Sequence, residues 1–315
     1  MAKRRIDRFN GVLNINKPAG MTSHDVVDHL RKAAKMRRVG HTGTLDPMAT
    51  GVLPLCLGKA TKIVQYIIAQ DKEYIVDMKL GVVTDSQDTT GTMIEEHPIP
   101  AYAEADIDAV LDRFRGEIWQ TPPMISAKHH KGKRLYELAR EGVEVEREPC
   151  KITLHELRLE AVRLPVVRFR VTCSKGTYVR TLCHDIGQAL GCGACMAGLI
   201  RSRCGTFHLD DAVALDSLKS PDDIEEHLYN LNEALAALPA VFVGVEGKAS
   251  INCGRALTGG IITRRNGDFH AGSLVRMTAR DGTLLALGEA LLNSDQLDAF
   301  AGNLQVIKPV KVFSN

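Results

Sequence analysis

The chain has 315 residues, of which 44% are hydrophobic and 25% are charged, with 27 Gly and 12 Pro. This composition excludes fibrous and disordered proteins, and the length predicts about two domains with a core that needs no metal or disulfide for stability. The 40 Lys and Arg nearly balance the 38 Asp and Glu, so a polyanionic partner would have to bind a local basic patch.

Charge is distributed unevenly along the chain. Residues 1–72 contain thirteen basic and five acidic residues, a net charge of +8, which leaves about −6 for the rest. The asymmetry favours an anionic ligand on the N-terminal part, although a solvated basic face explains it equally well. The sequence contains neither a run of about 18 apolar residues nor an apolar signal core, so we expect a cytoplasmic protein without a membrane partner.

The N-terminal segment is predicted to form a strand, a helix and a loop. Residues 11–16 are a short apolar strand, and Ser23 is the predicted N-cap of a helix that continues into the basic stretch 31–38. Residues 39–51 contain three glycines and a proline but little periodic apolar content, which predicts a loop. Loops of this kind carry function more often than packing.

The middle of the chain alternates predicted strands with predicted helices. The strands cover residues 52–57, 74–80, 152–159 and 166–172, and the helices cover 60–69, 105–114, 135–140 and 177–190. The basic segment 119–134 is a candidate RNA-facing loop, although an exposed basic hairpin without a ligand is equally ordinary.

The sequence changes character after Pro239. Residues 212–238 are predicted to be helical, whereas the following residues form short apolar pieces separated by glycine turns. Asp281-Gly282 lies between two of these pieces and is a strong hairpin signal. We therefore predict two domains, residues 1–240 and a small β-barrel of residues 241–315.

The eight cysteines are expected to be reduced in the cytoplasm. Cys192 and Cys195 form one CxxC pair that could hold a metal together with nearby Cys and His residues. The pair has neither a second CxxC nor a closely spaced histidine pair as its partner. Small buried hydrophobes are therefore the favoured interpretation, and no metal is predicted.

Chemistry-bearing motifs are few. The sequence lacks the signatures of nucleotide hydrolysis, nicotinamide redox chemistry, zinc proteolysis and nucleophile-elbow hydrolysis. What remains is one carboxylate, Asp46, in the glycine loop, where a constrained carboxylate can act as a nucleophile or a general base. By residue type alone, an Asx-turn or a helix cap is the commoner role for such an aspartate.

Eight short sequence motifs, called sequence words below, occur in chain order and narrow this interpretation. They are residues 11–23, 40–53, 58–62, 72–74, 84–88, 120–128, 134–140 and 176–182. Together they closely resemble the TruB family of tRNA pseudouridine synthases over about residues 11–207. The tail 243–313 resembles the PUA RNA-binding domain that ends many members. The resemblance implies an α+β fold, with a mixed, largely antiparallel sheet and packed helices, followed by a small PUA-like β-barrel.

The family resemblance also implies a reaction. A uridine in the T-loop of transfer RNA, at position 55, would be cut at its N1–C1′ bond, turned and rejoined through C5. The target base must first be flipped into the active site. The resemblance implies tRNA as the partner, no cofactor and no obligate protein partner. A protein that folds tRNA without catalysis is the rival interpretation, and both roles are compatible. A glycosidase-like hydrolase would need a second carboxylate.

Three catalytic residues follow from the resemblance. Asp46 matches the catalytic aspartate, Tyr74 matches the tyrosine that stacks on the uracil, and Arg180 matches the arginine that pairs with the aspartate. A bidentate Arg180 would lower the pKa of Asp46 and keep it ionised. By residue type alone, Tyr74 would be a core tyrosine and Arg180 a helix-surface ion-pair partner.

Six further residues are expected to contact substrate or RNA. Lys17 and Lys62 would bind phosphates together with the basic stretch 31–38. Asp88 would contact RNA, shape the pocket or simply form a turn. The others are His41, near the flipped nucleotide or bound to the loop backbone; Tyr178, in the last sequence word; and Leu199, beneath the base and before Ile200-Arg201, where the family has paired arginines.

Overall fold

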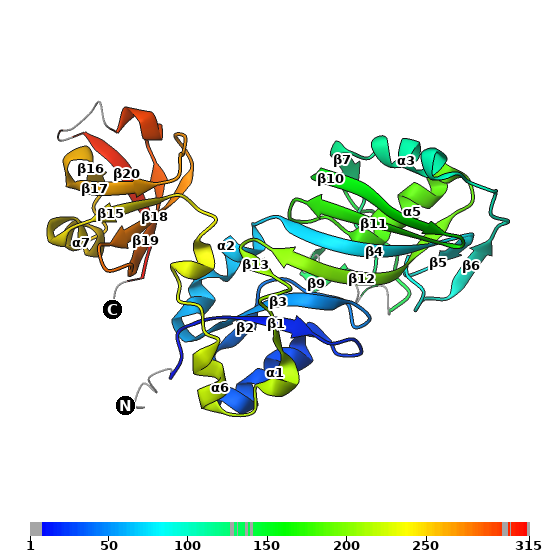
Figure 1. Ribbon diagram of the computed structural model, residues 1–315, viewed down its shortest axis with the longest axis horizontal. Coiled ribbons are helices and arrows are strands. Elements are labelled where there is room, and N and C mark those ends of the chain that lie inside the picture. The colour runs from blue at the N-terminus through cyan, green and yellow to red at the C-terminus, as the bar shows by residue number, and fades with distance from the viewer. Residues whose placement is uncertain are drawn as a thin grey trace.

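The centre of the computed structural model is a ten-stranded mixed sheet (Figure 1). Residues 8–126, 129–130, 132–135, 138, 141–297, 302 and 304–313 are described. The sheet has the order β14-β1-β3-β12-β4-β11-β10-β7, with β2 paired to β3 and β13 to β12. Its strands are β1 (Gly11–Lys17), β2 (Val39–His41), β3 (Thr50–Leu57), β4 (Lys72–Leu80), β7 (Gly116–Gln120), β10 (Cys150–Arg163), β11 (Val166–Cys173), β12 (Ala194–Cys204), β13 (Phe207–His208) and β14 (Val213–Ala214).

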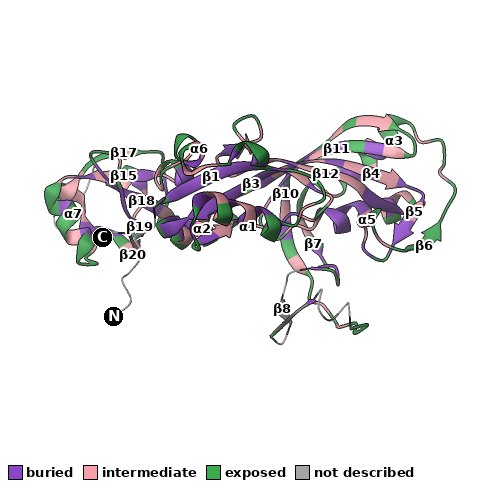
Figure 2. Ribbon diagram, turned by 90° about the horizontal axis from the view of Figure 1, so that it is seen from below, coloured by how far each residue is buried: buried purple, intermediate pink, exposed green. Residues whose placement is uncertain are grey.

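The pairing confirms the predicted α+β class with a mixed sheet. Among the described strands of this sheet, the β1–β14 and β12–β3 pairs are parallel and the other pairs are antiparallel. Strand β4 lies near the middle, between β12 and β11, and its residues alternate between buried and half-buried. This alternation places Tyr74, Val76 and Met78 on one face, in the apolar core. Figure 2 shows β1 and β3, which are buried along almost their whole length, in purple.

Helices and short hairpins surround this sheet. They are α1 (Ser23–Ala34), α2 (Val64–Ile68), α3 (Glu104–Asp112), α5 (Val179–Leu190), α6 (Pro221–Glu226), the 3-10 helices η1 (Gly58–Ile63), η2 (Leu215–Ser217) and η3 (Glu233–Leu235), and the pairs β5 (Val82–Thr84) with β6 (Met93–Glu96) and β8 (His129–His130) with β9 (Lys133–Arg134). Helix α5 ends as predicted at Gly191, whose φ of 85° suits glycine.

Helix α1 begins one residue earlier than predicted. Its N-cap is Thr22, which forms a capping box with Asp25, so the predicted N-cap Ser23 is wrong. Ser23 is instead buried inside the first turn, where its hydroxyl bonds the backbone of Leu45. The Ser23 side chain, which was expected to cap the helix, therefore binds the backbone of the glycine loop instead.

The predicted helix over residues 212–238 is also wrong. This segment contains β14, η2, α6 and η3; β14 pairs with β1 at the edge of the large sheet, and the other pieces contact β1, α1 and α2 separately. Ser220 caps a new short helix that starts with Pro221, which cannot continue a preceding helix. The buried residues Leu218, Ile224 and Leu235 enter two different apolar clusters, so packing overrides a single helical face.

The C-terminal part forms a second sheet of six strands. Its order is β16-β20-β19-β18-β15-β17, and it surrounds its own apolar cluster. Its elements are β15 (Ala240–Val243), α7 (Val245–Asn252), β16 (Leu257–Thr258), η4 (Gly259–Ile261), β17 (Ile262–Asn266), β18 (Leu274–Ala279), β19 (Leu284–Ala290), η5 (Ser294–Gln296) and β20 (Gln305–Val312). The predicted Asp281-Gly282 turn connects β18 and β19.

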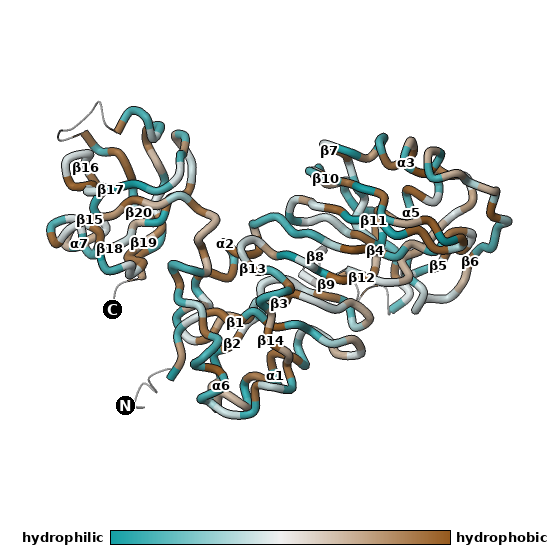
Figure 3. The backbone as a smooth tube through the Cα atoms, viewed as in Figure 1, coloured by the Kyte–Doolittle hydropathy of each residue, from teal (hydrophilic) through white to brown (hydrophobic). Residues whose placement is uncertain are grey.

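The two sheets share a buried interface. Leu284, Leu287 and Phe313 join an apolar cluster with Val12 and Val52 of the large sheet. Figure 3 shows hydrophobic residues, in brown, along the strands of both sheets. In addition, the buried guanidinium of the β18 residue Arg276 donates to the carbonyl of Leu238 at 3.0 Å and to the Asn232 side chain at 2.6 Å, which ties the connecting segment to the second sheet.

Two predicted features fall partly outside the described residues. These are the basic loop 119–134, of which residues 127–128 and 131 are not described, and the helix 135–140, of which 136–137 and 139–140 are not described. In the part of the chain that the structure describes, no helix is long and apolar enough to cross a membrane.

Candidate active site

The loop that carries Asp46 is fixed on both sides of this residue. On one side, the Leu45 N–H donates to the Ser23 hydroxyl at 2.9 Å, and that hydroxyl donates to the Leu45 carbonyl at 3.2 Å. On the other side, the Pro47 carbonyl accepts from the Gly20 N–H at 2.8 Å. Because these partners belong to α1 and to the turn after β1, two neighbouring elements hold the backbone of Asp46 in place.

Lys17 also fixes the backbone of this loop. Its side chain is fully buried, and Nζ donates to the carbonyls of Pro18, Pro47 and Ala49 at 2.9, 3.2 and 2.7 Å. Burial lowers the pKa of Lys17 to about 8, while the nearby carboxylate of Asp46 acts in the opposite direction. The expectation that Lys17 binds phosphate is therefore corrected, because its ammonium has no face toward solvent and braces the loop.

We expect replacement of Lys17 by methionine to destabilise the protein by about 2 kcal/mol, because the carbonyls that it satisfies lose their donor. Lys62 is the matched control, since its side chain is exposed on η1 and its replacement by methionine should stay within about 0.5 kcal/mol. Chemical denaturation measures both free energies of unfolding. Equal values for the two variants would contradict the bracing role.

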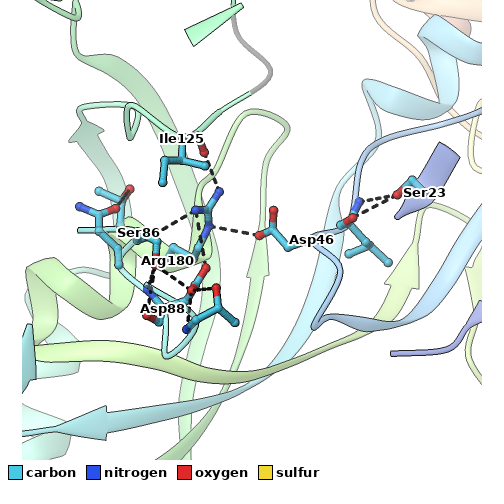
Figure 4. A network of polar contacts seen from close by, with 10 residues as sticks. Ser23, Asp46, Ser86, Asp88, Ile125 and Arg180 are labelled. Atoms are coloured by element: carbon cyan, nitrogen blue, oxygen red, sulfur yellow. Dashed lines mark hydrogen bonds and ion pairs between the residues drawn. The ribbon is translucent and has the colours of Figure 1, made fainter. Parts of the chain in front are cut away.

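Arg180 lies at the centre of the polar network (Figure 4). It extends from the first turn of α5, and its side chain is only 8% exposed. Nε contacts Asp46 Oδ2 at 3.1 Å, Nη1 donates to the Ser86 carbonyl at 3.0 Å, and Nη2 donates to the Ile125 carbonyl at 2.8 Å. Asp88 Oδ2 lies 3.7 Å from Nη1. Three segments far apart in the sequence therefore meet at one guanidinium.

The contact between Arg180 and Asp46 differs from the bidentate pair that the sequence suggested. Only Nε reaches the Asp46 carboxylate, because the two Nη atoms are engaged by backbone carbonyls. Burial raises the pKa of Asp46 above its usual value of 3.8, and the nearby Asp88 adds to this rise, whereas Arg180 and Lys17 oppose it. The net direction is opposite to the predicted one, since desolvation outweighs a single ion-pair contact.

This shift predicts an acid limb in the pH–rate profile. If Asp46 acts as a carboxylate, the single-turnover rate should fall as the pH decreases through a value above 3.8, because protonation removes its charge. The raised pKa also affects stability. As the pH rises through this pKa, Asp46 ionises, and its buried charge then lowers the stability of the folded protein. An acid limb at or below the usual aspartate value would contradict this assignment.

Asp88 organises the loop that faces Arg180. It is 4% exposed, and its Oδ1 accepts from the Ser86 hydroxyl at 2.8 Å and from the Thr90 N–H at 2.9 Å. Its backbone carbonyl accepts from the Thr84 hydroxyl at 2.7 Å. Of the three roles that the sequence left open, these contacts support turn formation and pocket shaping, because the carboxylate is directed into the protein.

Tyr74 and Leu199 lie on one face of the central strands. Tyr74 pairs across the sheet with Arg201, and Leu199 pairs with Val76, two residues further along each strand. Both side chains are 8% exposed and belong to the large apolar cluster. Burial raises the pKa of the Tyr74 hydroxyl to about 12, against a lowering contribution from Arg201. The phenol therefore stays protonated at neutral pH.

The remaining predicted residues are on the surrounding segments. His41 is at the end of β2, and its Nδ1 accepts from the Gly43 N–H at 3.3 Å, which is the loop-backbone role considered above. Tyr178 precedes α5, and the buried side chain of Gln120 brackets its backbone, accepting from its N–H at 2.7 Å and donating to its carbonyl at 3.0 Å. Lys62 is exposed on η1.

Sequence reasoning missed four residues of this region. They are Ser23 and Gln120, which clamp backbone beside Asp46 and Arg180, Ser86, whose carbonyl binds Arg180, and Arg201, which pairs with Tyr74 across the sheet. The first three are polar residues inside sequence words already singled out, and that position was a usable signal. Their partners are 22, 58 and 94 residues away, so spacing alone does not reveal the contacts.

Six of the eight cysteines are buried, whereas Cys150 is half-buried and Cys253 is exposed. Cys192 and Cys195 are buried, and burial raises the pKa of the Cys195 thiol. Among the described residues, no three His, Cys, Asp or Glu side chains are grouped so that they could hold a metal ion.

Known proteins are similar to this chain in both sequence and fold. Residues 31–179 match the model of the TruB family pseudouridylate synthase N-terminal domain, and residues 180–238 match that of the tRNA pseudouridylate synthase B C-terminal domain. Proteins named tRNA pseudouridine synthase B are 44% identical in Heliobacterium modesticaldum, over 91% of this chain and 93% of the relative, and 42% identical in Moorella thermoacetica, over 96% and 98%.

Solved structures agree over nearly the whole chain. A chain from a Cbf5-Nop10-Gar1 complex is 29% identical, with a TM-score of 0.78, covering 96% of this chain and 85% of that one. A chain from an H/ACA RNP bound to a substrate RNA containing 2′-deoxyuridine is 27% identical, with a TM-score of 0.76 and coverages of 97% and 85%.

Proposed function

The chain belongs to the TruB family of pseudouridylate synthases, and we propose that it isomerises the uridine at position 55, in the T-loop of transfer RNA, to pseudouridine. As a pseudouridine synthase it is an enzyme. The tRNA substrate is supported by the names of its relatives, whose sequences align with almost all of this chain. The observation that carries the proposal is the contact between the clamped Asp46 and the buried Arg180.

The pocket supports a division of roles among three residues. Asp46 offers a carboxylate that Arg180 orients and that is 34% exposed, whereas the neighbouring Asp88 side chain is 6% exposed, so Asp46 is the one that stabilises or captures the ring or the sugar while the base is detached. Tyr74 presents an aromatic face and a protonated hydroxyl to the flipped uracil. Leu199, on the same sheet face, provides an apolar floor beneath the base.

The reaction balances without a cofactor. The N1–C1′ bond breaks, the uracil turns, and a C5–C1′ bond forms. The proton on C5 is lost, and N1 gains a proton, so one C–N bond is exchanged for one C–C bond with no net oxidation. The enzyme must hold the base, exclude competing water and move one proton, and these are tasks for side chains.

Basic surfaces on both parts of the chain support RNA binding. The N-terminal part exposes Lys32, Lys35, Arg37, Arg38, Lys59 and Lys62, and the C-terminal part exposes Lys248, Arg255, Arg264 and Arg280. Phosphates would pair with such groups, and the affinity would fall with added salt. We propose the division into a catalytic domain, residues 1–240, and a PUA-like RNA-binding barrel, residues 241–315. The change of sheet at β15 supports this boundary.

Tritium release from tRNA carrying [5-³H]uridine tests the proposal, because the C5 hydrogen leaves only when C5 becomes bonded to the sugar. A tRNA with cytidine at position 55 is the matched control. Release from the first RNA but not from the second would support T-loop specificity. Equal release from both would refute the assigned position, and no release would refute the reaction.

A further inference from the structure

Arg201 is a buried cation at the centre of the large sheet. Its side chain is 1% exposed, and it is among the largest fully buried side chains of the described residues. In the part of the chain that the structure describes, no carboxylate pairs with it; its Nε donates to the Val52 carbonyl at 2.6 Å and its Nη2 contacts the Gly43 carbonyl at 3.4 Å. Burying a guanidinium without a carboxylate carries a large desolvation penalty. The hydrogen bonds that Arg201 makes to its neighbours have to offset this penalty.

The backbone leaves Arg201 little freedom. On β12 it pairs with Tyr74 of β4 on one side and with Gly51 of β3 on the other. Gly51 has a φ of +99°, and a Cβ at this position would lie 2.3 Å from the Arg201 carbonyl oxygen, so the two strands approach as closely as glycine allows. The register of β12 against β4 shifts between Arg201 and Arg203, which is where a bulge re-aims a side chain.

Three segments of the candidate site therefore meet at this side chain. Gly43 belongs to the loop that carries Asp46, Val52 belongs to the strand that follows this loop, and Tyr74 belongs to the neighbouring strand. Figure 1 shows β12 between β3 and β4, where it can join them. Arg180 fixes the Asp46 carboxylate from one side, whereas Arg201 connects the backbone of the same loop to Tyr74.

The chemistry of the guanidinium determines how it can act on Tyr74. A guanidinium only donates hydrogen bonds, so toward Tyr74, its partner across the two strands, the phenolic oxygen is the atom that can accept. The phenolic hydrogen is then free to point away from Arg201. We propose that Arg201 is a positioning residue that holds the Tyr74 hydroxyl with its hydrogen directed at the flipped base and keeps it in register with the Asp46 loop. This inference rests on the proposed function, in which Tyr74 contacts the base.

A double-mutant cycle tests this role. Arg201→Lys keeps the positive charge, but the three donors of an ammonium sit on one nitrogen, so they cannot reach partners that are spaced for the separate nitrogens of a planar guanidinium. We expect the single-turnover rate at saturating tRNA to fall about 10- to 100-fold, with tRNA affinity changed only a few-fold. In a Tyr74→Phe background, Arg201→Lys should cause no further loss, because the group on which it acts is gone. Arg203→Lys, on the same strand, is the control and should leave the rate unchanged.

The outcomes separate this inference from the function on which it rests. Equal losses in the wild-type and Tyr74→Phe backgrounds would show that Arg201 only supports the fold, and an unchanged rate would also overturn the proposal. If Arg201→Lys does not fold, the same comparison is made with Arg201→Gln. A wild-type chain without turnover would refute the proposed function itself. Additive losses on an active enzyme would refute this inference alone.

Discussion

Replacing Asp46 by asparagine is expected to reduce isomerisation by more than about 10⁴-fold while tRNA affinity changes only a few-fold. The amide keeps the volume of the carboxylate and an oxygen that can accept from Arg180 Nε, so the loop should keep its shape. The negative charge is lost, and with it the ability to stabilise or capture the detached fragments. Tritium release measures turnover, and filter binding measures the dissociation constant of the RNA complex.

Asp77→Asn provides the matched control for this experiment. Asp77 pairs with Arg168 through two contacts of 2.7 Å on the exposed side of β4 and β11, outside the candidate site. Its replacement also removes one carboxylate from an arginine pair, but it should leave turnover near the wild-type rate. Substantial turnover by the Asp46 variant, or an equal loss in the Asp77 variant, would remove Asp46 from its catalytic role.

Arg180→Met is expected to damage both activity and stability. The rate should fall by about 10²- to 10³-fold, because Asp46 loses the group that orients it. The free energy of unfolding should fall by about 3 kcal/mol, since the nearly buried carboxylate of Asp88 is left without its cation and the Ser86 and Ile125 carbonyls lose a donor. Single-turnover kinetics and chemical denaturation measure the two effects.

A second substitution separates the two effects of Arg180. Asp88→Asn removes the charge that Arg180→Met leaves unpaired, so the double variant should recover part of the stability but none of the rate. Arg168→Met is the control for loss of a guanidinium, and because that side chain is 47% exposed it should cost less than about 1 kcal/mol. Wild-type stability in Arg180→Met would contradict the central position of this side chain in the network.

Local sequence patterns predicted the elements more reliably than their arrangement. Strand β4 was recognisable because its residue types alternate with a period of two, which matches its alternating burial. Helix α5 was recognisable because its apolar residues recur at helical spacing up to Gly191. Residues 212–238 misled because polar and apolar residues there satisfy a helical pattern, although Pro221 interrupts it. The long-range cores decide this case, since Leu218 and Leu235 pack in different clusters.

By itself, the sequence placed the chain in its family, predicted the α+β class and singled out Asp46, Tyr74 and Arg180 as catalytic candidates, because these inferences depend on motifs of adjacent residues and on short periodicities. Only the tertiary structure decided what surrounds each of them. Lys17, expected to bind phosphate, is buried beneath the Asp46 loop, and the pKa of Asp46 moves upward because burial outweighs Arg180. Desolvation and hydrogen bonds between distant segments, such as the one between Gly43 and Arg201, which are 158 residues apart, are set by packing, which no local pattern encodes.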